Sequence, residues 1–303
     1  METVYLTTAI GRAAGGGKKP PADPEKVFDL EQILADRNPG LLRKLPPGVL
    51  AAARLLVHER LVNAALTAGS GLSAAAFCDY VLRRLSITVR VENEHYLRRS
   101  TRPVVCANHP AGAVEGVALI SAVLRVYGTC RVPANDLLQL VRPLAPLIVP
   151  VNRSRPSRHD LMALIEAFEG DHPILMFPAG TTARVYGGRL REYAWHPTFV
   201  TRARRSRREI LPVWVSGRNS WWFYLIHRIR RVLRIGFNFE MALLVDELVR
   251  RRGETVTLRF AAPRRAKEND RTGVGSGHAA DRRQAAALRR EVEALAHKSG
   301  GTL

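Results

Sequence analysis

The chain has 303 residues, 46% of them hydrophobic, which is enough for a substantial core. This length allows one α/β domain with tails or two domains, and we favour one domain. Its 47 lysines and arginines outnumber 27 acidic residues, and the net charge of +20 indicates an anionic partner: nucleic-acid phosphate, an anionic membrane surface, or acidic substrates and carriers. The spacing of Cys78, Cys106 and Cys130 indicates neither a disulfide framework nor a zinc site, so we expect a reducing compartment. No uncharged apolar stretch of about 18 residues occurs, so we expect neither export nor a membrane span.

Residues 1–25 are predicted to be a flexible arm, because they contain the glycine-, lysine- and proline-rich run Gly15–Pro21. Glycines before a lysine are also found in phosphate-binding loops. Here the spacing is wrong, Lys19 stands where a serine or threonine should bind magnesium, and no strand precedes it. We therefore expect no phosphate-binding loop in the arm.

Residues 26–85 are predicted to be helical, since segments 28–34 and 49–61 carry apolar residues at helical spacing. Helices of this kind mostly pack against a core. Segments 42–46 and 82–85 mix apolar and cationic residues, so one face could instead lie on lipid. Core packing is the favoured interpretation.

Strands and helices alternate after residue 86. Apolar runs predict strands at 87–91, 104–107, 147–151, 174–177, 210–215 and 256–260, with helical patterns between them, notably over 158–169. Alternation of this kind predicts an α/β fold with a mainly parallel central sheet covered by helices. Residues 26–265 then form one domain, a helical part (26–85) and a sheet-based core (86–265). Residues 266–303 are expected to be a loose segment followed by a charged helix over 282–298.

The turn after the predicted strand 104–107 holds His109, and the helix predicted from residue 114 begins with Glu115 in its first turn. In open α/β sheets, ligands bind beyond the carboxyl ends of the strands. A carboxylate in the first helical turn is also favourable for the helix dipole. This pairing indicates a catalytic base and its orienting partner; the simpler alternative is a histidine that caps a helix beside a dipole-stabilising glutamate.

Four segments form a recognisable series: residues 108–116 (Asn-His-Pro-Ala-Gly-Ala-Val-Glu-Gly), 135–138 with 146–153, 177–180 (Phe-Pro-Ala-Gly) and 212–220. The series resembles the glycerolipid acyltransferases, whose boxes are His-x4-Asp in an Asn-His turn and Phe-Pro-Glu-Gly. It is more similar to the hemolysin-like, ornithine- and glycine-lipid O-acyltransferase branch, with Asn-His-Pro-x-Gly-x-x-Asp-Gly and Phe-Pro-Ala-Gly-Glu. The similarity continues through 236–241 and 246–247 and covers roughly residues 26–265.

Two positions depart from this branch. Glu115 replaces the aspartate, which keeps the charge but adds a methylene. Thr181 replaces the glutamate after Phe-Pro-Ala-Gly and so removes a carboxylate that could contact the acceptor.

The resemblance implies transfer of a fatty acyl group from an acyl thioester to a hydroxyl of a lysolipid. His109 would remove the hydroxyl proton, and Glu115 would hold the imidazole tautomer and stabilise the imidazolium. General-base help of this kind is worth about 10²–10⁴ in rate. The thioester of acyl carrier protein or coenzyme A is already activated, so neither an acyl-enzyme nor a metal or other cofactor is expected.

Substrate-binding candidates come from the same boxes. Gly180 follows a strand and lets the backbone approach a ligand, and the resemblance points to Arg153 and Arg184 for phosphate or carboxylate recognition. Each arginine has a solvated surface charge as its alternative, and the segment around Arg218 and Asn219 could simply be a turn. The complete candidate set is Asn108, Gly112, Arg153, Gly180, Thr181, Arg184, Arg218 and Asn219.

Residues 221–226 (Trp-Trp-Phe-Tyr-Leu-Ile) are followed by the basic segment His227–Arg231. Aromatic and cationic side chains together are typical of an interfacial segment, although aromatic packing in the core is equally compatible. With the resemblance, this predicts a peripheral protein on the cytoplasmic face of an anionic membrane.

Two alternatives stay open. A nucleic-acid-binding protein is suggested by the charge and by the arginine run 202–208, but no RNP, KH or zinc-finger pattern supports it, so no nucleic acid is expected. A catalytically silent, lipid-binding relative is suggested by Glu115 and Thr181. A serine hydrolase is disfavoured, because the chain has no Gly-x-Ser-x-Gly elbow.

Overall fold

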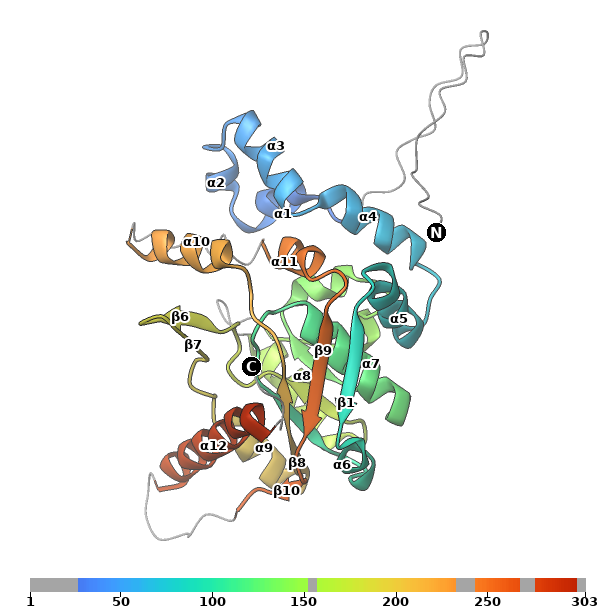
Figure 1. Ribbon diagram of the computed structural model, residues 1–303, viewed down its shortest axis with the longest axis vertical. Helices are drawn as coiled ribbons and strands as arrows, with labels where there is room; N and C mark the ends of the chain where they lie inside the picture. Colours follow the sequence, from blue (N-terminus) through green and yellow to red (C-terminus); the bar gives the residue numbers. More distant parts are fainter. Residues whose placement is uncertain (1–26, 152–156, 233–242, 268–275, 299–303) are drawn as a thin grey trace.

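The computed structural model describes residues 27–151, 157–232, 243–267 and 276–298, and its centre is a mixed sheet (Figure 1). The strands of this sheet are β1 (Thr88–Glu92), β2 (Val104–Ala107), β5 (Ile174–Met176), β8 (Glu209–Val215), β9 (Thr255–Phe260) and β10 (Arg264–Arg265). Their order is β1-β9-β8-β2-β5, and β10 pairs with β8. The pairs β1–β9, β8–β2 and β2–β5 are parallel, whereas β8 meets β9 and β10 in antiparallel register. The predicted α/β fold with a mainly parallel sheet is confirmed.

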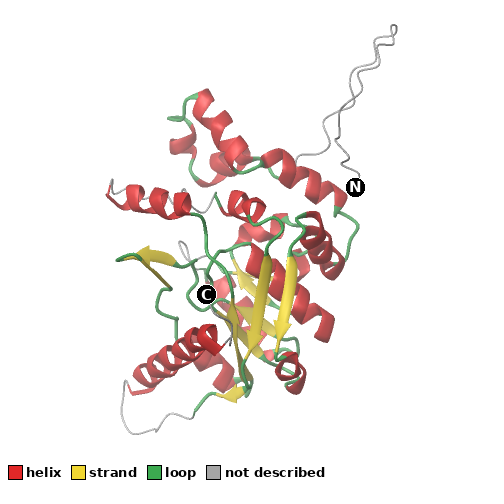
Figure 2. Ribbon diagram, viewed as in Figure 1, coloured by secondary structure: helices red, strands yellow, loops and turns green. Residues whose placement is uncertain are grey.

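Helices cover both faces of the sheet (Figure 2). They are α5 (Ala74–Arg84) and α7 (Val114–Tyr127) on one face, and α8 (Arg158–Glu169), α9 (Thr198–Arg205) and α12 (Ser276–Leu295) on the other. The four residues of β2 are all buried and alternate between the two cores: Val105 and Ala107 pack with α5 and α7, Val104 and Cys106 with the other group. Period-two alternation in an apolar strand thus creates two cores with β2 between them.

The N-terminal part is helical, as predicted. It contains α1 (Leu30–Arg37), α2 (Pro39–Leu42), α3 (Pro47–Leu56) and α4 (Glu59–Ala68) before α5. The side chain of Asp29 caps α1, and Ser73 caps α5 by accepting the Ala76 N–H at 3.3 Å. The helices differ in burial: α5 buries Phe77 in the core, whereas α3 buries none of its residues. Core packing therefore holds for α5 but not for α3, which in Figure 1 lies at the end of the molecule beyond the sheet.

Other elements connect the layers. They are α6 (Glu94–Arg99), β3 (Val132–Ala134), η1 (Asp136–Leu140), η2 (Ala145–Leu147), β4 (Ile148–Pro150), β6 (Arg184–Tyr186), β7 (Arg189–Arg191), α10 (Trp221–Val232), α11 (Leu244–Arg250) and η4 (Ala296–Lys298). The strand predicted at 147–151 is β4, which pairs with β3 in a small separate sheet.

The short strands β3 and β10, the hairpin β6–β7 and the bounds of the C-terminal helix differ from the sequence expectation. The hairpin β6–β7 turns at Gly187 and Gly188, both at positive φ, but its short strands are cationic and lack the apolar alternation of a buried strand. The C-terminal helix α12 runs over 276–295 and continues as η4 to residue 298, so it begins six residues before the expected range of 282–298. In the part of α12 before residue 282, the Asp281 carboxylate accepts the Thr201 hydroxyl and the guanidinium of Arg204 from α9.

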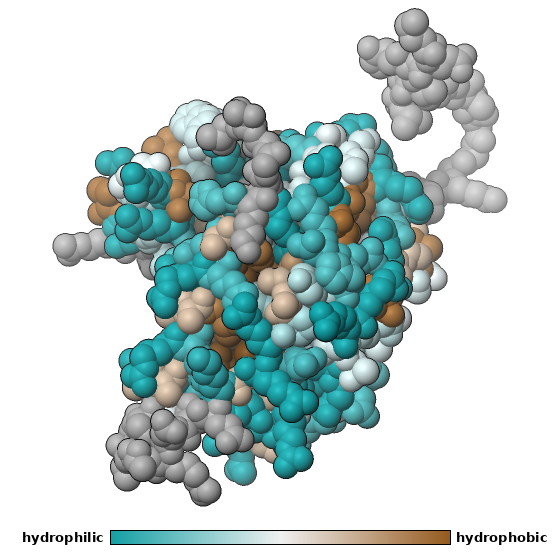
Figure 3. Space-filling model, turned by 60° about the horizontal axis from the view of Figure 1, so that its bottom comes forward, coloured by the Kyte–Doolittle hydropathy of each residue, from teal (hydrophilic) through white to brown (hydrophobic). Residues whose placement is uncertain are grey.

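The face of the molecule in Figure 3 is mostly hydrophilic, in keeping with the high content of charged residues. In the part of the chain that the structure describes, no helix is both long enough and apolar enough to cross a membrane.

Candidate active site

The site begins where β2 ends. Asn108, the next residue, donates from Nδ2 to the Val215 carbonyl at 2.9 Å and accepts the Val215 N–H on Oδ1 at 2.6 Å. Its amide therefore imitates one more residue of the β2–β8 ladder and joins the two loops that leave these strands. The backbone of β8 thus engages both ends of the Asn108 side chain, and the role of Asn108 in substrate binding stays a prediction.

His109 and Glu115 lie together, as the sequence pattern suggests. The imidazole Nδ1 is 3.1 Å from Glu115 Oε1. The same oxygen accepts the backbone N–H of Ala111 at 2.7 Å and that of Gly112. Three donors thus converge on one carboxylate oxygen, so the added methylene of glutamate still brings the charge to the ring.

Burial and hydrogen bonding act in opposite directions on Glu115, which is fully buried. Burial by itself raises its pKa, but the His109 side chain and the Gly112 N–H outweigh this and hold the pKa below its usual value. Glu115 is therefore ionised at neutral pH. Because Nδ1 faces this carboxylate, Nε2 is the nitrogen turned away from it, and the His109 side chain is 17% exposed.

Gly112 allows the turn to close tightly. Its φ is +110°, and a Cβ there would lie 2.7 Å from Leu244 of α11 and 2.9 Å from Thr182. A side chain at this position would separate the turn from both neighbours. Gly112 thus contributes its backbone N–H and its lack of a side chain.

The Phe-Pro-Ala-Gly segment packs directly on the histidine. The Phe177 and His109 rings are stacked, with centroids 4.3 Å apart and planes at 22°. The Gly180 N–H closes a turn on the Phe177 carbonyl at 2.9 Å, and the Ala183 N–H binds the His109 carbonyl at 2.8 Å. In the turn that follows Phe177, Gly180 is exposed and Thr181 is half-buried.

A second carboxylate, which sequence reasoning missed, contacts the histidine. Glu192 Oε1 accepts the His109 backbone N–H at 2.6 Å, and Oε2 accepts the Trp195 indole N–H at 3.0 Å. Burial raises the pKa of Glu192 to about 7, although both N–H donors and Arg289 counteract the rise. Nothing in the cationic sequence around Glu192 signals this contact, because its partner lies 83 positions earlier.

Arg184 is turned inward instead of lying on the surface. It is 2% exposed, and its Nη1 donates to the Thr182 carbonyl at 2.8 Å and to the Thr182 hydroxyl. Its Cζ lies 4.8 Å from the centre of the Phe223 ring. Arg184 therefore braces the loop of Thr182 against α10. Arg153, the other predicted anion ligand, lies outside the described residues.

The loop after β8 places Arg218 and Asn219 differently. Arg218 is exposed, while Asn219 is 3% exposed. The Asn219 N–H donates to the Tyr224 hydroxyl at 2.9 Å, and the Ser220 N–H to Glu247 of α11 at 2.7 Å. Within the described residues, neither the oxygen nor the nitrogen of the Asn219 amide has a hydrogen-bond partner. A buried amide of this kind is costly unless a ligand or water completes it.

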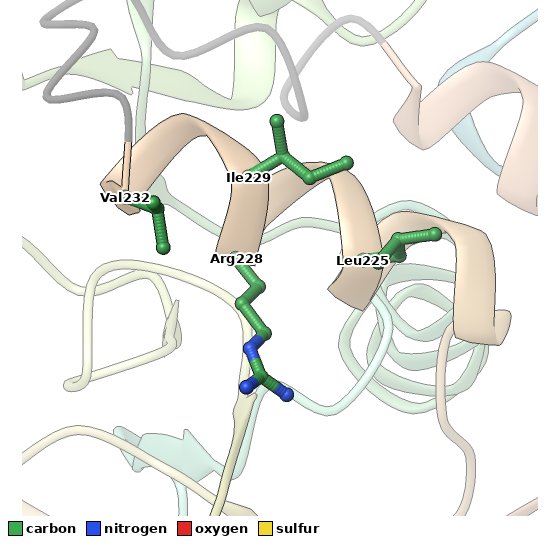
Figure 4. A pocket seen from close by; sticks show the side chains of 4 residues that line it. All are labelled: Leu225, Arg228, Ile229 and Val232. Carbon is green, nitrogen blue, oxygen red and sulfur yellow. The ribbon is translucent and has the colours of Figure 1, made fainter.

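The aromatic segment 221–226 forms the start of α10 and is divided between core and surface. Phe223 is fully buried. Trp221 and Trp222 are 61% and 50% exposed and stack with ring centroids 3.8 Å apart. Further along the helix, Leu225, Arg228, Ile229 and Val232 line a surface hollow of about 270 Å³ (Figure 4). Core packing thus holds for Phe223, while the interfacial role of the exposed tryptophans stays a prediction.

Comparison with known proteins gives consistent results. Residues 32–294 match the acyltransferase family. Lyso-glycine lipid O-acyltransferases from Bacteroides thetaiotaomicron and Phocaeicola vulgatus are each 32% identical over 239 residues, covering 78% of this chain and 88% and 86% of the relatives. Among solved structures, the 1-acyl-sn-glycerophosphate acyltransferase PlsC from Thermotoga maritima aligns with a TM-score of 0.45 and 16% identity, over 83% of this chain and 98% of that one.

Proposed function

The chain belongs to the acyltransferase family, and from this premise we propose that it transfers a fatty acyl group from an acyl thioester to a hydroxyl of a lysolipid, with His109 as general base. The observation that carries this mechanism is the 3.1 Å contact of His109 Nδ1 with the buried, ionised Glu115. It lies beyond the carboxyl end of a central parallel strand, where such folds bind ligands.

Each group has one task in the reaction. Glu115 keeps the proton on Nδ1, so that Nε2 can take the proton of the acceptor hydroxyl as its oxygen attacks the thioester carbonyl carbon. Collapse of the tetrahedral intermediate breaks the carbon–sulfur bond. The imidazolium returns the proton to the leaving thiolate, which departs as a thiol. The products are an ester and the free thiol, with no acyl-enzyme.

For the acceptor we propose a lysolipid with an acidic headgroup, because the relatives act, by name, on a lyso-glycine lipid. Gly180 and Thr181 are accessible in the turn after Phe177, whose ring stacks on His109, and Arg218 supplies an exposed charge beyond β8. The Asn219 amide offers a donor and an acceptor that the protein itself leaves without partners among the described residues. Arg184 acts indirectly, through the loop of Thr182 that it braces.

The donor and the location follow from charge. Acyl carrier protein and coenzyme A thioesters are both anionic, and the net charge of +20 would steer either toward the protein. An anionic lipid surface at the cytoplasmic face of the membrane would be attracted by the same charge. The exposed tryptophans of α10 suit the headgroup region of such a surface.

The test is an acyl-transfer assay with the full chain, labelled acyl-coenzyme A or acyl carrier protein, and a panel of lysolipids. His109→Ala should reduce the rate at least ~100-fold, the size expected of a general base. The control is His159→Ala, at an 86% exposed side chain at the start of α8, which should change little. Unchanged transfer in the His109 variant would exclude the mechanism, and salt-sensitive DNA binding without transfer would favour the nucleic-acid alternative.

A further inference from the structure

Residues 178–196 form an excursion from the sheet between β5 and α9, and the hairpin β6–β7 lies at its tip (Figure 1). The His196 N–H closes its base on the Pro178 carbonyl at 3.0 Å. The excursion contacts His109 through both of its backbone groups: Ala183 binds the carbonyl and Glu192 binds the N–H. Such two-sided contact fixes the backbone from which the imidazole projects.

Glu192 is itself held firmly. Its second oxygen accepts the indole N–H of Trp195, which is 5% exposed and packs edge-on against Phe199 at 5.8 Å. The Glu192 carbonyl accepts Arg289 Nη1 from α12 at 3.2 Å. Contacts with α9 and α12 thus hold the Glu192 carboxylate in place against the turn that contains His109.

We propose that Glu192 is a positioning residue for His109: its ionised carboxylate holds the backbone N–H and so fixes the direction of the imidazole, while Glu115 fixes its tautomer. The proposal rests on the role of His109 as general base. A charge-assisted bond to a backbone N–H is short and strong. Displacement of a catalytic group by about 1 Å can reduce a rate by 10².

The proposed positioning role requires the ionised form of Glu192. Both of its oxygens accept N–H donors, which suits a carboxylate, whereas a protonated carboxyl has a hydroxyl in place of one acceptor. The titratable and charged groups around it are His109 with its partner Glu115 and, from α12, Arg289, which also pairs with Glu293. Burial dominates over these groups and raises the pKa of Glu192 to about 7. Activity should therefore decline as the pH falls through about 7 and this carboxyl takes up a proton.

The experiment compares kcat against pH for the wild-type chain and Glu192→Gln, with Glu94→Gln at an exposed position of α6 as the matched control. The two N–H groups bind different oxygens of Glu192. Glutamine has an NH₂ donor in place of one of these oxygens, so one of the two N–H groups loses its acceptor. We expect kcat of Glu192→Gln to fall roughly 10-fold, with KM for both substrates within about twofold, as for a misaligned base. In the wild type the acid limb of log kcat should include the protonation of Glu192, whose pKa is about 7. This step should be absent from Glu192→Gln.

Two further variants keep the test decisive. Glu192→Asp retains the charge and should recover part of the lost kcat. Trp195→Phe removes a donor that lowers the pKa of Glu192, so the acid limb of kcat in this variant should move to higher pH. Both variants test the proposal even if Glu192→Gln does not fold. A wild-type profile and kcat in every variant, with His109→Ala inactive, would overturn the positioning role alone. Activity retained by His109→Ala would overturn the proposed function itself.

Discussion

Glu115 receives three donors on one oxygen, His109 Nδ1 and the N–H groups of Ala111 and Gly112. Aspartate would withdraw the carboxylate by about one bond length, ~1.5 Å. We expect Glu115→Asp to lower kcat at least ~10-fold and the uncharged Glu115→Gln about 10² or more, within the range of a disabled general base. Steady-state kinetics of the folded variants measures both. An increase in the aspartate variant would mean that the site is not fitted to the longer side chain.

Gly112 offers a second residue-scale prediction. Gly112→Ala places a methyl group against Leu244 and Thr182 at φ +110°, so it should lower the free energy of unfolding by ~1–3 kcal/mol. Gly116 is the matched control, because it lies inside α7 with open space around its missing Cβ. Gly116→Ala should raise the stability by ~0.5–1 kcal/mol. Urea unfolding measures both, and equal stability of the two variants would contradict the close packing of the turn.

How far the sequence predicts the site depends on how local each contact is. His109 and Glu115 are separated by six positions and one turn, so strand, turn and helix patterns suffice to bring them together. Glu192 reaches His109 across 83 positions, from a segment without periodic signal. Arg184 is buried and lies in cation–π contact with Phe223, a contact that depends on the tertiary fold and that the local sequence does not signal. Its role in anion recognition stays a prediction.

At the scale of elements, strands buried on both faces were the easiest to predict, since β2 and β8 are continuous apolar runs. The hairpin β6–β7 was missed because it buries little. It is positioned from outside its own sequence: Arg231 of α10 donates to the Tyr186 hydroxyl at 3.2 Å. Contacts of this kind join α10 to the excursion that carries Glu192.

Helix α10 gives the prediction at this scale. The double variant Trp221→Ala/Trp222→Ala should bind vesicles containing phosphatidylglycerol roughly tenfold more weakly, which corresponds to ~1.4 kcal/mol of binding free energy. This loss is smaller than the ~1.5–3 kcal/mol gained by fully burying one large apolar side chain. The control is Leu161→Ala/Met162→Ala on α8, 48% and 56% exposed in the wild type. Vesicle sedimentation measures both. Equal losses in the two double variants would show that α10 has no special role at a lipid surface.

For the whole molecule, the charge of +20 and the chemistry of the site act at different ranges. Exposed charges attract anions over about a Debye length, ~8 Å at physiological ionic strength. Buried and partly buried carboxylates respond instead to their immediate neighbours. Hydrogen-bonded partners outweigh burial and lower the pKa of Glu115 and of the partly buried Asp246, whereas burial prevails at Glu192. The three groups therefore affect the stability of the fold in opposite directions as pH changes.

The signs can be worked out for each group. Glu115 and Asp246 stabilise the fold above their unfolded pKa values, and this contribution is lost as the pH falls through their lowered folded values. Glu192, with a folded pKa of about 7 against an ordinary 4.5, binds more protons in the folded state between these values, so the stability it contributes falls as the pH rises through that window. In Glu192→Gln this dependence disappears, while all other titrating groups remain. The difference in unfolding free energy between wild type and Glu192→Gln should therefore favour the wild type more at pH ~5 than at pH ~8. Urea unfolding at both pH values measures this, and a difference independent of pH would show that Glu192 does not titrate in this range.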